Sequence, residues 1–241
     1  MHRLIHSAAM LLAAAPSLAA TFQFGSGANG LVGVATGEAL ADGVTLQIAA
    51  GPDGALLDEA GRAGLGVDSR PIAGVSGNEI DKFDVLAGAT PLAGVGESIT
   101  FSFDKPGRIT RLNFDGVKDE SLEHFVLTGE NGQRVTFFDS AANVSAPGAV
   151  DSAIAAGAVS GQVVYLLEDA LYDDDAIGLS IPFEAGEQFL LTYAELGAQF
   201  GPTEAGNGAR LTSITVQAIP EPCSVLLVLL AAPLSPRRRP S

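Results

Sequence analysis

The chain has 241 residues, which is enough for one domain of ordinary size with a buried core, or for two small ones. Apolar residues make up 47% of the sequence, which excludes a chain that is disordered by composition. The formal net charge of −15 argues against binding to the phosphate backbone of nucleic acids, and it favours solubility and the attraction of divalent cations.

Residues 1–20 have the parts of a secretory signal peptide in the right order. Arg3 precedes an apolar stretch over residues 7–15, Pro16 interrupts that stretch, and the small residues that follow offer a cleavage site. The stretch is shorter than the about 20 residues that a membrane span needs. We therefore expect a cleaved leader and an exported chain, with a buried N-terminal helix as the alternative.

A glycine-rich segment over residues 25–30 matches the pattern G-x-G-x-x-G. A dinucleotide-binding site of this pattern needs a strand before it and a helix after it. The residues that follow, 31–35, make a poor helix because they include Gly33. The segment is therefore predicted to be a loop.

Alternation of apolar and polar residues dominates residues 21–218 and predicts one all-β domain, an antiparallel β-sandwich or jelly roll. Strands are expected at 44–48, 98–103, 108–115, 124–128, 134–138, 163–167, 177–183, 188–193 and 211–217. A turn at 105–107 is expected to close a hairpin between the second and third of these, and Asn131-Gly132 one between the fourth and fifth. Helical signals are confined to 149–159 and 193–200.

Two acidic segments could supply the oxygen ligands that Ca²⁺ prefers. The first contains Asp68, Asn78, Glu79 and Asp81, and the second is Asp173–Asp175. Neither follows the D-x-D-x-D-G pattern of a calcium loop, so a solvated acidic loop is the alternative. We expect no other cofactor.

His124 is the only histidine after the leader, and Ser121 and Asp119 are near it in sequence. A nucleophile elbow or oxyanion-hole motif does not accompany them, so we expect a strand histidine rather than a catalytic triad. A glycoside hydrolase built on a pair of carboxylates remains an alternative, because the chain is rich in acidic residues. In the absence of Trp, candidates for contact with sugars are Tyr165, Tyr172 and Tyr193.

Residues 219–241 contain three elements in order: a rigid Pro-Glu-Pro tripeptide, an apolar stretch over 223–234, and a terminal arginine cluster. The motif residues are Pro220, Glu221, Pro222, Arg237, Arg238 and Arg239. The apolar stretch predicts a short transmembrane helix whose arginines stay on the cytoplasmic side. The chain's single cysteine, Cys223, begins this stretch, so an intrachain disulfide is excluded.

This tail resembles the sorting signal of PEP-CTERM proteins. The resemblance implies processing by an exosortase-type enzyme near the motif, a membrane-anchored precursor, and delivery to the cell surface or extracellular matrix. The segments Gly64–Val67, Asn78–Asp81 and Glu97–Phe103 resemble β-sandwich ectodomains that often precede such tails. That resemblance implies an adhesive or carbohydrate-binding module, with extracellular polysaccharide as a candidate partner.

From these features we expect an exported, surface- or matrix-associated protein without enzymatic activity, with a role in adhesion, structure or weak glycan contact. A calcium-dependent carbohydrate-binding module and the carboxylate-pair hydrolase are the alternatives. Nucleic acid is not an expected partner.

Overall fold

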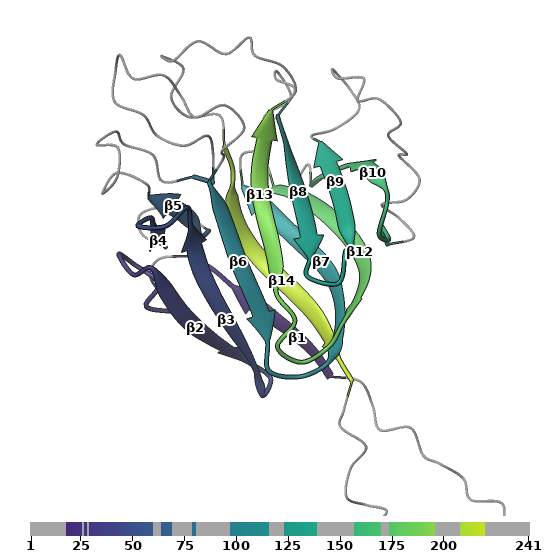
Figure 1. Ribbon diagram of the computed structural model, residues 1–241, viewed down its shortest axis with the longest axis horizontal. Coiled ribbons are helices and arrows are strands. Elements are labelled where there is room, and N and C mark those ends of the chain that lie inside the picture. Colours follow the sequence, from purple (N-terminus) through teal and green to yellow (C-terminus); the bar gives the residue numbers. More distant parts are fainter. Residues whose placement is uncertain are drawn as a thin grey trace, which may run out of the picture.

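The structure is a computed structural model that describes residues 18–25, 27, 29–59, 64–68, 79–80, 97–115, 123–138, 157–169, 174–195 and 208–219. Every regular element in these ranges is a β-strand (Figure 1). The strands form two main sheets and a small two-stranded sheet, so the all-β prediction is confirmed.

The first sheet has five strands, and each of its pairings is antiparallel. In spatial order they are β1 (Leu18–Gln23), β14 (Arg210–Ala218), β7 (Gly107–Asp115), β12 (Asp174–Phe183) and β11 (Leu167–Asp169). Strands from both ends of the described chain therefore lie side by side in this sheet.

The second sheet has seven strands and is antiparallel except for β10, which runs parallel to β9. In spatial order they are β10 (Val163–Tyr165), β9 (Arg134–Phe138), β8 (Glu123–Gly129), β13 (Phe189–Glu195), β6 (Ser98–Phe103), β3 (Val44–Gly51) and β2 (Thr36–Ala41). The small sheet pairs β4 (Leu56–Asp58) with β5 (Gly66–Asp68).

The two main sheets enclose a hydrophobic core rich in phenylalanine. The ring of Phe103 in β6 lies 5.8 Å from that of Phe22 in β1 and 4.8 Å from that of Phe183 in β12. Phe114 in β7 stacks on Phe125 in β8 at 5.1 Å. Such pairs add about 0.5–1.5 kcal/mol each beyond the burial of their area. The contacts join strands of opposite sheets, as in a β-sandwich.

One predicted hairpin is confirmed and the other is wrong. Strands β8 and β9 pair, and Gly132 in their turn has the positive φ that the Asn-Gly signal requires. Strand β6 instead pairs with β3 and β13, and β7 pairs with β14 and β12. The turn over residues 104–106 therefore carries the chain from one sheet to the other. Both strands bury one apolar face, so their alternation is the same whether they pair side by side or face each other.

Two local predictions are also wrong where the structure describes them. Residues 193–195 belong to β13 rather than to a helix, because they pair with β8 and Tyr193 packs on Phe125 in the core. The expected strand over 163–167 divides at Leu166 into β10 of one sheet and β11 of the other. The described end of the other expected helix, residues 157–159, is not helical either, because Ala158 forms an isolated parallel bridge with Leu179. The remainder of both expected helices, 149–156 and 196–200, lies outside the described residues.

The first and last described strands place the two ends of the domain together. Leu18 of β1 pairs with Ala218 of β14, so β1 begins and β14 ends at the same end of the sandwich (Figure 1). Strand β1 begins at Leu18, so Leu18–Ala20 of the expected leader lie in the sheet. In the ranges that the structure describes, no helix is long and apolar enough to cross a membrane.

Candidate functional site

The glycine-rich loop surrounds the carboxylate of Glu59, which is 0% exposed. Its Oε1 accepts the N–H of Gly25 at 3.0 Å and the side-chain amide of Asn29 at 2.7 Å. Its Oε2 accepts the N–H of Asn29 at 3.1 Å and that of Leu31 at 3.4 Å. The backbone carbonyl of Glu59 accepts the N–H of Gly27.

Backbone N–H groups that converge on one point make a binding place for an anion. In this loop the anion is a carboxylate of the same chain, and the loop is followed by an isolated bridge and strand β2 rather than by a helix. The predicted loop is confirmed, and its donors bind the carboxylate of Glu59 rather than an external anion.

A buried ion pair lies next to this loop. The guanidinium Nη2 of Arg210 in β14 is 3.6 Å from Oδ2 of Asp58 in β4, and both side chains are largely buried. Its Nη1 donates to the carbonyl oxygens of Asp58 at 3.4 Å and Gly64 at 3.3 Å. The pair joins the small β4–β5 sheet to the five-stranded sheet, which is a structural use of these charges.

The first calcium candidate is only partly within the described residues. Asp68 is the last residue of β5. The backbone carbonyl of Glu79 accepts the N–H of Val67 in that strand at 3.4 Å, so Glu79 lies close to β5. Asn78 and Asp81 lie outside the described residues. Among the residues that the structure describes, no three His, Cys, Asp or Glu side chains are grouped so that they could hold a metal ion.

The second acidic segment lies at the start of β12, between β7 and the edge strand β11. Asp174 in β12 pairs with Asp115 in β7 on one side and with Asp169 in β11 on the other. The backbone register thus brings acidic residues from three strands level with one another. Asp173 lies outside the described residues.

His124 is a strand residue, as expected, and its ring stacks on Phe138 at 4.6 Å. Ser121 and Asp119 lie outside the described residues.

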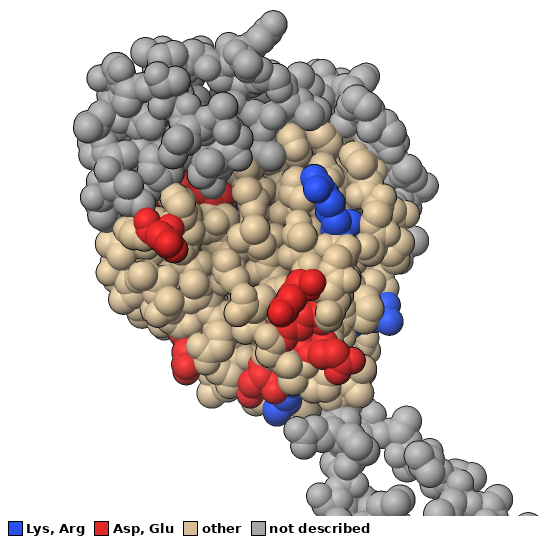
Figure 2. Space-filling view, viewed as in Figure 1, with Lys and Arg blue, Asp and Glu red and all other residues tan. Residues whose placement is uncertain are grey.

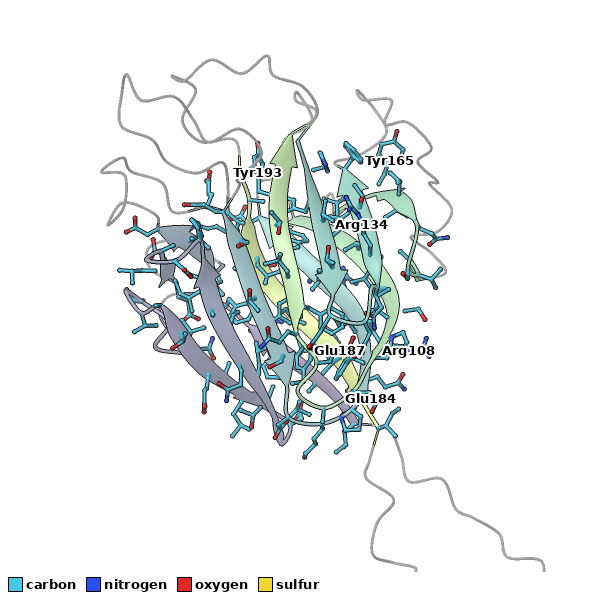
Figure 3. The ribbon with its side chains drawn as sticks, in the orientation of Figure 1. Arg108, Arg134, Tyr165, Glu184, Glu187 and Tyr193 are labelled. Carbon is cyan, nitrogen blue, oxygen red and sulfur yellow. The ribbon has the colours of Figure 1, made fainter. Side chains whose placement is uncertain are left out.

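Glu187 is the buried carboxylate in the turn between β12 and β13, where Glu184 lies beside it (Figure 3). It accepts the side-chain amide of Gln133 at 2.7 Å and the N–H of Glu184 at 2.9 Å. These bonds fix the turn and connect it to the β8–β9 hairpin. Glu187 therefore has a structural role in the fold.

Every Phe and Tyr in the described residues is buried, including Tyr165 and Tyr193. Tyr172 lies outside the described residues. In the described part, no aromatic ring is exposed for a sugar to stack on, which distinguishes this surface from the aromatic platforms of many carbohydrate-binding clefts.

The outer side of the seven-stranded sheet presents a row of hydroxyl groups, which we name the hydroxyl face. Its members are Ser98, Thr100 and Ser102 of β6, Thr192 of β13, Thr128 of β8 and Thr136 of β9. They alternate with buried core residues, so they point away from the core. The register aligns Thr192 with Ser98 on the neighbouring strand. Figure 2 looks onto this sheet and shows a largely uncharged surface, with an acidic cluster in its lower middle and further charged groups nearer its outline.

The sorting motif, with Pro220–Pro222 and Arg237–Arg239, lies outside the described residues. The last described residue, Ile219, directly follows β14 and precedes that motif. Comparison with known proteins finds no matching family model, no matching curated protein and no matching solved structure.

Proposed function

We propose that the chain is an exported, non-enzymatic protein of the cell surface or extracellular matrix, and that its C-terminal segment displays the β-sandwich. We infer a PEP-CTERM sorting route with an exosortase-type enzyme as partner, and a short transmembrane helix in the precursor. The repeated passage of the chain between the two sheets supports a jelly-roll-like sandwich as the displayed domain.

The observation that carries this proposal is the antiparallel pairing of β1 with β14, in which Thr21 pairs with Thr215. Strand β14 ends at Ala218, at the end of the sandwich where β1 begins, and the motif at Pro220 follows two residues later in the sequence. Asp115 pairs with Arg210 at the opposite end of the sheet. A domain held by its C-terminal segment would therefore direct that opposite end away from the membrane.

The buried carboxylates support a structural rather than a catalytic use of the domain. Glu59 is held by the glycine-rich loop, and Glu187 is held by a turn. Catalytic acids need access to substrate and a pKa matched to their task, whereas both of these groups hold backbone segments in place.

The test is fractionation of a native host that produces the tagged chain. We expect the protein in the surface or matrix fraction, and we expect replacement of Pro220, Glu221 and Pro222 by alanine to retain it in the membrane fraction. Glu38→Ala, at an exposed position of β2, is the matched control and should leave the distribution unchanged. Recovery of the unmodified chain from the soluble cytosol, whether or not the motif is replaced, would reject the proposal.

A further inference from the structure

We propose that the hydroxyl face binds neutral polysaccharide, that is, uncharged polymers rich in hydroxyl groups. This inference rests on the proposed surface role, because an exported protein is one that meets such polymers. It assigns the contact to the seven-stranded sheet, whose outer side is shown in Figure 2.

The charge distribution is the first argument. The chain has 28 acidic residues, yet the outward positions described in β3, β6, β8, β9 and β13 carry a single permanent charge, Arg134, and Glu38 of the edge strand β2 adds one acidic group. Arg134 stands on β9, near one side of the sheet (Figure 3). Charged ligands are recognised by opposite charges, so a face without them matches a neutral ligand.

The chemistry of the side chains is the second argument. Each Ser or Thr hydroxyl both donates and accepts hydrogen bonds, as sugar hydroxyls do. Neighbouring strands lie about 4.8 Å apart, so Ser98 and Thr192 place two hydroxyl groups side by side, with Val126 of β8 on the other side of Thr192. Leu190, 40% exposed in β13, adds an apolar contact next to Thr100, with which it pairs.

The same observations argue against the other occupants of a flat face. Two copies of a chain with a net charge of −15 repel each other at close range, and an acidic polymer is repelled for the same reason. Without exposed aromatic rings in the described residues, the contact has no stacking contribution. We therefore expect weak binding at each site and stronger retention by a polymer that engages many sites.

The experiment is native electrophoresis of the full-length chain in a mild non-ionic detergent. The gels contain dextran, galactomannan or hydroxyethylcellulose as neutral polymers, alginate as an acidic polymer, or no polymer. The double variants Thr100→Val/Thr192→Val and Thr100→Lys/Thr192→Lys alter the hydroxyl face. Gln217→Lys adds the same kind of charge at an exposed position of β14 in the other sheet and is the matched control. Far-UV circular dichroism establishes that each variant is folded.

We expect at least one neutral polymer to retard the wild-type chain and alginate not to do so. Loss of one or two hydrogen bonds should weaken the apparent affinity of the face variants about tenfold, and the control should bind as the wild type does. Four results would overturn the inference: no retardation by any neutral polymer, retardation that the face variants leave unchanged, equal retardation by alginate, or self-association that the face variants abolish. Because fractionation tests the surface role separately, failure here leaves that proposal standing.

Discussion

Replacing Glu59 tests whether one buried carboxylate holds the glycine-rich loop in place. Glu59→Ala removes the acceptor for the N–H groups of Gly25 and Asn29, at 3.0 and 3.1 Å, and for the side-chain amide of Asn29 at 2.7 Å. Glu59→Gln keeps the size of the side chain but replaces one of the two acceptor oxygens with a donor. That donor then faces N–H groups that also need an acceptor.

The expected magnitude follows from these contacts. A hydrogen bond to a charged group contributes about 1.5–3 kcal/mol, and part of the loop remains accessible to water, which can replace some of the lost acceptors. We therefore expect Glu59→Ala to lower the free energy of unfolding by about 3–5 kcal/mol, and Glu59→Gln by about 2 kcal/mol or more.

Urea denaturation followed by far-UV circular dichroism measures this change, since the chain has no Trp for fluorescence. Glu38→Gln is the matched control, because Glu38 is exposed and its carboxylate accepts the amide of Gln47 at the surface. The control should change stability by no more than about 0.5 kcal/mol. If Glu59→Ala were as stable as that control, the carboxylate would not be what orders the loop.

Two further predictions concern the region around Arg210. Arg210→Met leaves the buried Asp58 without this ion pair, so we expect urea denaturation to show a loss of about 3–5 kcal/mol in the free energy of unfolding. Arg111→Met, at an exposed position, is the control and should change the free energy of unfolding little. Equal effects of the two substitutions would show that the ion pair does not join the sheets. Gly64→Ala should lower the free energy of unfolding by more than Gly30→Ala does. Both glycines have a positive φ, which alone should cost Gly30→Ala about 1–2 kcal/mol. The Cβ at residue 64 would lie 2.7 Å from that of Arg210, while the one at residue 30 meets nothing within 4 Å. Equal melting temperatures of the two glycine variants would contradict this reasoning.

Local chemistry was sufficient to predict most strands and one hairpin, but not the other strand pairings. The β8–β9 hairpin could be predicted because Gly132 supplies the positive φ that the short turn over residues 130–132 needs. The turn after Phe103 has equally good signals, yet whether the next strand pairs in the same sheet or enters the facing one depends on which layer completes the core.

The candidate sites depended even more on tertiary structure. The alternation of Ser98, Thr100 and Ser102 with Ile99, Phe101 and Phe103 predicts which residues of β6 face outward. It does not show that Thr192, distant in sequence, lies beside them. Nor does any local pattern distinguish Glu59 from the chain's other carboxylates, because its N–H partners belong to a loop about 30 residues earlier.

The most direct test of the proposed surface role is the intact mass of the protein recovered from its native host. We expect a mature form that lacks the leader and the apolar segment after Pro222 and that is found outside the cytoplasm. Cleavage after Ala20 would leave Thr21–Gln23 of β1 paired with β14. A soluble cytosolic product with the mass of all 241 residues would contradict the account.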